Sequence, residues 1–516
     1  MKRIPNIKTT HVWLSVVLVL GMALAGCSQF LLPEIQEAKP VLSDETDLTR
    51  SVYLALLKTQ NNHKVSLDEL SQIVDAVLNT TQGGRSIAPS GSTITGVKKV
   101  PLAGENRFAL SGSGRSIAVG AEEEPVEVYE FAIESTSGGN IGFVLASNDV
   151  RIGNILAIGE GSLADTNENF LAVLQANLED YIASTIREYD SITEAEIEAA
   201  IEAAIAAEST GARALANHWE DGFNLTGAYA YKSNFRESKP PLLKTKWGQG
   251  EKGVYSADGY AYNNYVKQVR NTSTVTGCVP TAMAQIIAYH NYIKYVSSYI
   301  PQPFFNNLGD WMMTYNLSKI RTMEKITNSS PSHEKAQVAV LMHQIGKLGG
   351  AVYQDDLTTM DFYPATQVFT TLGYSIAYAT NATLLTETSN SSTITYIALP
   401  STIRGALENY RPIFAYGYPR FGTVAHAWVI DGYGEITQYV EYFYNSGTNQ
   451  YSTVTITLNN CLMVHCNLGW DGRANGWYVY GIFDTRNRTL IEKSDDYSDS
   501  NYDFSTNTTI IIPMKP

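Results

Sequence analysis

Cys278 is the residue that the sequence places best to act as a nucleophile. It opens the run Cys278–His290, in which Met283 and Ile287 share one face of an amphipathic helix. Pro280 fits only the first turn of a helix, so we expect the thiol at the helix N-terminus. Unpaired N–H groups and the positive end of the helix dipole stabilise a thiolate there. A buried structural cysteine is the alternative, and the helix position alone does not decide between the two.

A thiolate that attacks a carbonyl needs an imidazole partner, and His426 is the best candidate among the eight histidines. His290 is excluded because 1.5 Å per helical residue places it about 18 Å along the helix axis from Cys278. His426 lies in the apolar run 425–432, which is typical of a buried strand. A neutral core imidazole is the alternative. The cysteine-to-histidine separation falls in the range of papain-like peptidases, which favours catalysis.

Asn467 follows a third apolar run and precedes Gly469 and Trp470. An asparagine at the end of a strand can accept the second imidazole N–H of His426 and so fix the tautomer of the ring. Trp470 would shield that hydrogen bond from water. The alternative for Asn467 is a turn-forming residue before the glycine.

These segments resemble the streptopain family of papain-like cysteine peptidases, bacterial enzymes made as zymogens. The resemblance rests on three motifs, which are 277–286, 426–432 and 467–470. It implies cleavage of peptide bonds in protein or peptide substrates and needs no metal or organic cofactor. It also implies that Gln249 joins the backbone N–H of Cys278 in an oxyanion hole. Leu468 departs from the family, which has tryptophan there, so shielding would rest on Trp470.

The resemblance extends upstream, where residues 126–190 are similar to the streptopain propeptide, most clearly at 142–144 and 146–149. It implies an intramolecular inhibitor that is removed by cleavage near residues 236–243. The fold class we predict is α+β, a papain-like peptidase with a helical lobe and a β-rich lobe behind a small α+β prodomain. We assign 1–26 to a lipoprotein signal peptide, 27–120 to an N-terminal region and linker, 121–190 to the propeptide domain, 191–238 to a helical insertion and activation linker, and 239–516 to the peptidase domain.

Local patterns predict the elements of the N-terminal half. Capping boxes at Ser66 and Thr193 each begin a helix, and alternating residues in 126–147 predict a hairpin. A further amphipathic helix is expected over 170–182. Residues 81–100 are rich in Gly, Ser and Thr, and we expect a loop or linker there.

The N-terminus is typical of an export signal. Basic residues precede an apolar run over 12–25, which is shorter than the roughly 20 residues a membrane-spanning helix needs. The run ends in the tetrad 24–27, which resembles a bacterial lipobox and implies that Cys27 is lipidated. More than one acyl chain gives stable anchoring, so we expect a protein of the cell envelope held in the membrane through Cys27.

The composition excludes one class of partner. The chain has 51 acidic residues against 37 Lys and Arg and a formal charge of −14, which argues against nucleic-acid binding.

Cys461 and Cys466 could form a disulfide, or a metal cluster together with His465. Side chains alternate between the two faces of a strand, so either arrangement would need a bulge to bring them together. We therefore expect two free or loosely paired thiols.

Two other functions stay open at this stage. The first is another Cys–His acyl-transfer enzyme, such as a transglutaminase-like amidase, in which Asp431 orients the base. The second is a non-catalytic surface lipoprotein that binds protein or glycan, which the 32 tyrosines and seven tryptophans favour.

Overall fold

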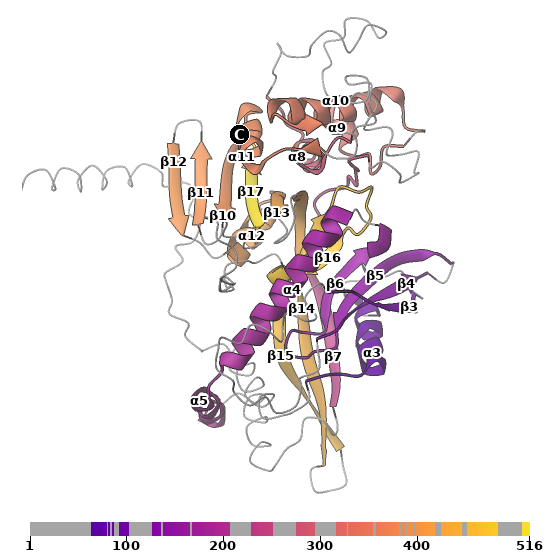
Figure 1. The fold of residues 1–516 in the computed structure, drawn as a ribbon, viewed down its shortest axis with the longest axis vertical. Coiled ribbons are helices and arrows are strands. Elements are labelled where there is room, and N and C mark those ends of the chain that lie inside the picture. The colour runs from indigo at the N-terminus through magenta and orange to yellow at the C-terminus, as the bar shows by residue number, and fades with distance from the viewer. Residues whose placement is uncertain are drawn as a thin grey trace, which may run out of the picture.

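The computed structural model describes residues 63–79, 81–82, 85–86, 92–102, 126–135, 138–165, 168–206, 229–250, 275–294, 316–327, 329–353, 358–380, 383–388, 391–396, 399–417, 425–445, 451–482 and 508–516. Helices and strands alternate irregularly along the chain, and the main sheet is antiparallel at every recorded pairing (Figure 1). The α+β prediction is confirmed.

The N-terminal unit is a curled sheet with helices against it. Its elements are α3 (Leu67–Leu78), β1 (Thr81–Gln82), β2 (Arg85–Ser86), β3 (Thr93–Lys99), β4 (Val128–Glu134), β5 (Asn140–Ser147), β6 (Ile155–Glu160), α4 (Glu168–Ser191) and α5 (Glu194–Ala206). Both predicted capping boxes form: Ser66 and Glu69 bond reciprocally at the start of α3, and Thr193 and Glu196 do so before α5. The predicted hairpin is β4–β5.

The second unit contains the predicted peptidase residues. Its elements are β7 (Tyr229–Lys239), α8 (Cys278–His290), α9 (Leu317–Ile320), α10 (Ser332–Leu348), β8 (Val352–Tyr353), β9 (Thr358–Thr359), α11 (Phe362–Thr371), β10 (Ser375–Thr380), β11 (Thr383–Thr388), β12 (Ser391–Tyr396), α12 (Leu399–Glu408), β13 (Ile413–Gly417), β14 (His426–Asn445), β15 (Tyr451–Asn467), β16 (Gly476–Val479) and β17 (Thr508–Met514). Helices α8, α9 and α10 gather at one end of the molecule (Figure 1), and α8 packs between α10 and strand β14.

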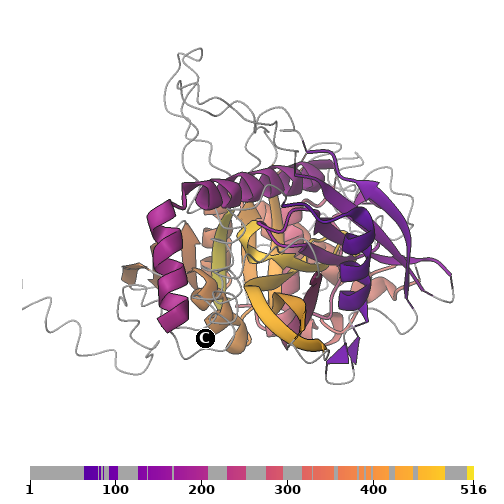
Figure 2. The same ribbon diagram turned by 90° about the horizontal axis from the view of Figure 1, so that it is seen from below.

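One 13-stranded sheet runs through both units in the order β12-β11-β10-β17-β13-β14-β15-β16-β6-β5-β4-β3, with β7 paired to β14. The two units meet where β16 pairs with β6, at Gly476 opposite Gly159. A Cβ on Gly476 would lie 2.2 Å from the carbonyl oxygen of Ile158, so this approach needs glycine. Helix α4 lies across the sheet and contacts β14 (Figure 2).

Two expected linkers contain strands. Residues 93–99, inside the segment expected to be a loop, form β3 and pair with β4. Residues 229–239, inside the expected activation linker, form β7 and pair with β14 from Tyr442 to Tyr433. In both cases the neighbouring strand supplies hydrogen-bond partners that local composition does not reveal.

Candidate active site

Cys278 is the first residue of α8, as predicted, and Pro280 lies in the first helical turn. Gly277 precedes it with φ of 94°, a backbone conformation that favours glycine. The thiol accepts hydrogen bonds from the backbone N–H groups of Ala427, Val279 and Cys278 itself. Burial raises the pKa of the Cys278 thiol, and these N–H groups oppose that rise. The helix end therefore provides donors for a thiolate in an otherwise apolar setting.

His426 is the first residue of β14 and is 2% exposed. Its Nε2 lies 3.1 Å from the carbonyl oxygen of Leu468, and its ring stacks on Trp470 with 4.3 Å between centroids. Because a carbonyl only accepts, Nε2 carries the hydrogen and Nδ1 keeps the lone pair in the neutral ring. Burial lowers the pKa of His426 to about 3, although the Leu468 carbonyl opposes this.

The cysteine and the histidine lie on adjacent elements, and the hydrogen bonds described for them lead to different groups. The thiol of Cys278 bonds the N–H of Ala427, the residue directly after His426. The imidazole of His426 bonds Leu468 instead. With the thiol pKa raised and the imidazole pKa lowered, both groups are neutral near pH 7 in this state of the chain.

Asn467 does not contact His426, so that part of the predicted arrangement is wrong. Strand pairing places Asn467 opposite Val429, and residues that pair directly point to the same face of a sheet. Val429 is an odd number of residues from His426, so Asn467 and His426 lie on opposite faces. The Asn467 amide bonds Gln285 and the carbonyl of Thr245. The carbonyl of the next residue, Leu468, takes the place predicted for the asparagine.

The other two predicted residues lie beside these groups. Gln249 is 8% exposed, its N–H donates to the carbonyl of Gly469 at 3.1 Å, and its carbonyl accepts from the N–H of Thr276 at 2.9 Å. The segment that carries Gln249 thus lies between the end of β15 and the start of α8. Trp470 is 1% exposed and its ring stacks on the imidazole, but the Asn467 amide whose hydrogen bond it was expected to shield bonds Gln285 and Thr245 instead.

Asp431 belongs to a separate cluster. Its carboxylate lies 2.6 Å from Nδ1 of His465 and accepts the N–H of Leu243 at 3.0 Å. Its carboxylate is thus engaged by His465 and Leu243, which does not support the amidase alternative, in which Asp431 orients His426. Cys461 and Cys466 do not form a disulfide with each other, and the described residues contain no group of three or more His, Cys, Asp or Glu side chains arranged for a metal ion.

Sequence reasoning missed two contributors to this site. Leu468 acts through its backbone carbonyl, for which a sequence carries no residue-type signal. Gln285 was part of the family motif around Cys278 but had no role assigned. It is fully buried and lies two helical turns after the cysteine on the same face of α8. A polar residue on a buried helix face was the available signal.

Comparisons with known proteins identify the family of one segment of the chain. Residues 257–478 match the model of the Peptidase C10 family. No curated protein matches the chain. A mutant fragment of prointerpain A from Prevotella intermedia is 17% identical over 74% of this chain and 94% of its own, with a TM-score of 0.38. Active wild-type interpain A cysteine protease from the same organism is 19% identical over 54% of this chain and 95% of its own, with a TM-score of 0.31.

The motifs that resemble the streptopain family, from Gly277 to Trp470, all lie inside the matched segment. That segment also contains Cys278 and His426, the thiol and the imidazole described above. Residues 257–478 therefore form a domain of the peptidase C10 family, and the chain carries a cysteine-type peptidase.

Proposed function

We propose that this protein is an exported, lipid-anchored cysteine endopeptidase that is made as a zymogen and uses Cys278 as its nucleophile. One observation supports this most strongly. The thiol lies at the N-terminus of α8 against the N–H of Ala427, next to a histidine whose tautomer leaves a lone pair on Nδ1. A thiol and a basic nitrogen on adjacent elements are what acyl transfer by a cysteine requires.

In this proposal the Cys278 thiol gives its proton to Nδ1 of His426, and the sulfur attacks the carbonyl carbon of the substrate. The Leu468 carbonyl accepts from Nε2–H and so stabilises the imidazolium that forms. Gln249 and the N–H of Cys278 stabilise the oxyanion. The imidazolium then protonates the leaving amine as the C–N bond breaks, and water hydrolyses the acyl-enzyme with Nδ1 as base.

The protonation state of the site supports latency. In the full chain the thiol pKa is raised and the imidazole pKa is lowered to about 3, so a thiolate–imidazolium pair is disfavoured. Burial is the first cause of both shifts. Activation must then bring Nδ1 of His426 to the sulfur, where each charge stabilises the other.

The way in which the N-terminal unit joins the catalytic sheet supports its role as an intramolecular inhibitor. Strand β6 extends that sheet next to β16, and Glu160 at its end pairs with Lys246 at 2.8 Å. Lys246 belongs to the same segment as Gln249, so the N-terminal unit contacts the segment that would hold the oxyanion. Release of β6 would remove Glu160 from Lys246, which keeps its ion pair with Glu324 at 3.2 Å, and would expose the edge of β16.

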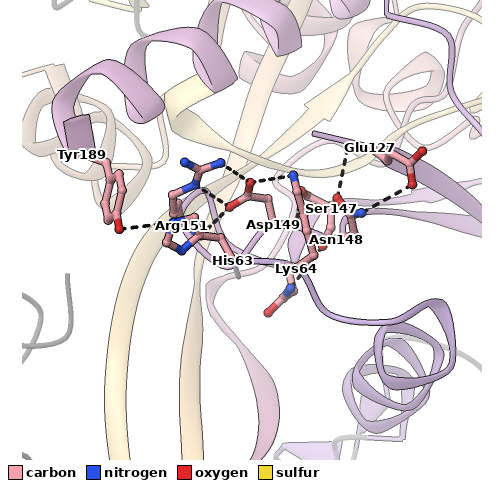
Figure 3. A network of polar contacts seen from close by, with 9 residues as sticks. His63, Lys64, Glu127, Ser147, Asn148, Asp149, Arg151 and Tyr189 are labelled. Carbon is pink, nitrogen blue, oxygen red and sulfur yellow. Dashed lines mark hydrogen bonds and ion pairs between the residues drawn. The ribbon is translucent and has the colours of Figure 1, made fainter. Parts of the chain in front are cut away.

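The propeptide-like motif 146–149 has a structural role of its own (Figure 3). Asp149 is fully buried and binds Arg151 at 2.7 Å and Lys64 at 2.9 Å. Burial alone would raise the pKa of Asp149, but these two cations outweigh it, and the pKa is lowered. The network ties the segment before α3 to the loop after β5. The N-terminal unit therefore has its own ionic core apart from the catalytic residues.

The proposed cut near residues 236–243 falls beside exposed backbone. Pro240 and Pro241 are exposed and follow the end of β7, whereas Leu242 and Leu243 are bonded to Asp431. Cleavage between these two parts would leave the Asp431 contacts with the enzyme and separate the N-terminal unit and β7 from it.

Export and lipidation of Cys27 rest on the sequence alone, because residues 1–62 lie outside the described residues. Among the helices that are described, none is long and apolar enough to cross a membrane. A test is labelling with an alkyne-bearing fatty acid in a bacterial host. We expect label in the membrane fraction of the wild type and none in Cys27→Ser. Equal labelling of both would contradict the anchor.

The enzymatic proposal is tested by comparing wild type with Cys278→Ala. We expect the wild type to process itself to a fragment that begins near residue 240 and then to hydrolyse casein, while Cys278→Ala stays at full length. Equal processing of both would contradict autocatalysis. A processed wild type that does not hydrolyse casein or peptide amides would contradict the endopeptidase.

A further inference from the structure

Two buried side-chain amides bond each other, one from α8 two helical turns after Cys278 and one from the end of β15. Gln285 on α8 is fully buried, and Asn467 at the end of β15 is 3% exposed. Each NH₂ group donates to the oxygen of the other amide at 3.2 Å. We call these two residues the Gln285–Asn467 amide pair.

The Asn467 amide is saturated by this arrangement. Its NH₂ group also donates to the carbonyl of Thr245 at 2.6 Å, and its oxygen also accepts the N–H of Gly469 at 3.4 Å. An asparagine amide offers two donors and two acceptor lone pairs, and all four are used within the described residues. The Thr245 carbonyl only accepts and the Gly469 N–H only donates, so a flipped amide would lose both bonds.

The amide pair holds the segment that ends at Gln249. The oxygen of Gln285 accepts the N–H of Trp247 at 3.2 Å, and the NH₂ of Asn467 holds the carbonyl of Thr245. The same segment is fixed beyond this point by the N–H of Gln249, which donates to Gly469. Helix α8, the end of β15 and residues 245–250 are therefore joined through two side chains.

We propose that Gln285 and Asn467 are positioning residues for the oxyanion-binding segment, and that they act through Gln249 and not through His426. The inference rests on the proposed function, because it takes Gln249 as a donor to the oxyanion. Such donors must lie within about 2.7–3.1 Å of the developing charge, and a misplacement of about 1 Å is enough to lower the rate by about 10²-fold. Loss of the amide pair would remove the hydrogen bonds to Thr245 and Trp247, and the remaining backbone bonds of the segment would then allow a shift of that size.

The experiment compares Asn467→Ala, Gln285→Met and Gln249→Ala in the full chain, each processed by immobilised wild-type enzyme that is then removed. The first readout is kcat/KM on a fluorogenic peptide amide. The second is the pH profile of Cys278 alkylation by iodoacetamide, which depends on the thiol and its imidazole but not on an oxyanion hole. Gln438→Ala is the matched control, since Gln438 is a buried amide that bonds Asn154 of the N-terminal unit.

We expect kcat/KM to fall by about 10²- to 10³-fold in Gln249→Ala and by about 10- to 100-fold in the amide-pair variants. The midpoint of the alkylation profile should stay at the wild-type value in all of them. Asn467→Ala should add little to Gln249→Ala, because both act on one donor. Gln438→Ala should match the wild type.

A shifted alkylation midpoint in Asn467→Ala would overturn the proposal in favour of a role through His426. Unchanged kcat/KM in both amide-pair variants, or full additivity with Gln249→Ala, would also overturn it. If both variants lose cooperative thermal unfolding, the pair serves folding and the proposal fails. Absence of peptide hydrolysis by the wild type would refute the proposed function itself, whatever the variants do.

Discussion

His426 and His290 are buried, and their lowered pKa values predict that acid destabilises the full chain. Burial lowers the pKa of His426 to about 3 and that of His290, at the other end of α8, to about 4, from an ordinary 6.5. The unfolded chain binds a proton at each histidine below pH 6.5, whereas the folded chain does not. The stability that each neutral histidine contributes is therefore complete above pH 6.5 and is lost as the pH falls toward the folded value.

The size of the effect follows from about 1.4 kcal/mol per pKa unit. A pH of 5 is about 1.5 units below the pKa of a histidine in the unfolded chain, which is therefore protonated, while the histidine in the folded chain stays neutral. Each histidine then lowers the free energy of unfolding by about 2 kcal/mol relative to pH 7. The measurement is urea unfolding of Cys278→Ala at both pH values, since this background cannot process itself.

His290→Phe and His426→Phe should each reduce the difference between pH 7 and pH 5 by about 2 kcal/mol, and together by about 4 kcal/mol. Tyr374→Phe is the matched control, because Tyr374 stacks on His290 with 5.5 Å between centroids and does not titrate in this range. It should leave the difference unchanged. If His426→Phe also leaves it unchanged, His426 is not a buried neutral base and the latency argument fails with it.

Three further substitutions test individual parts of the fold. Gly277→Ala forces a side chain onto a backbone with φ of 94° and places its Cβ 3.0 Å from Thr358. The free energy of unfolding in urea should fall by about 1–2 kcal/mol, and alkylation of Cys278 should slow. An unchanged alkylation rate would contradict strain at the start of the helix. Gly476→Val should break the pairing of β16 with β6, so limited proteolysis should remove the N-terminal unit faster than in wild type, and equal rates would argue against this junction. Asp431→Ala should lower the free energy of unfolding by about 1–3 kcal/mol, because Nδ1 of His465 and the N–H of Leu243 lose a buried hydrogen-bond partner. A shift in the pH profile of turnover would instead favour the amidase alternative.

Helices with local signals could be predicted from the sequence. The capping boxes at Ser66 and Thr193 and the proline in the first turn of α8 each specify a helix start through contacts within four residues. The hairpin β4–β5 could be predicted for the same reason, because the alternation of its side chains and its turn at Gly138 and Gly139 are both visible within a short stretch of sequence. Such elements need no knowledge of the rest of the chain.

Strands that depend on a distant partner could not be predicted in the same way. Residues 93–99 contain Thr, Gly and Lys and have an exposed pattern, yet they form β3 because β4 offers its edge. Strand β7 forms because β14 extends far beyond the helices and leaves an edge that must be paired. The sequence therefore suggested linkers where the structure has sheet edges.

The misplacement of Asn467 has a specific cause, which is a pair of bulges in the β14–β15 hairpin. Register shifts occur between Gln438 and Tyr439 and between Ile430 and Gly432, and the second leaves Asp431 as the extra residue. The first shift alone would place Asn467 opposite Ile430, on the same face of the sheet as His426. The predicted hydrogen bond between Asn467 and His426 requires that register. The second restores the original register, so Asn467 pairs with Val429 and faces α8. A one-residue insertion therefore decides whether this amide serves the imidazole or the oxyanion segment, and the sequence does not mark Asp431 as that insertion.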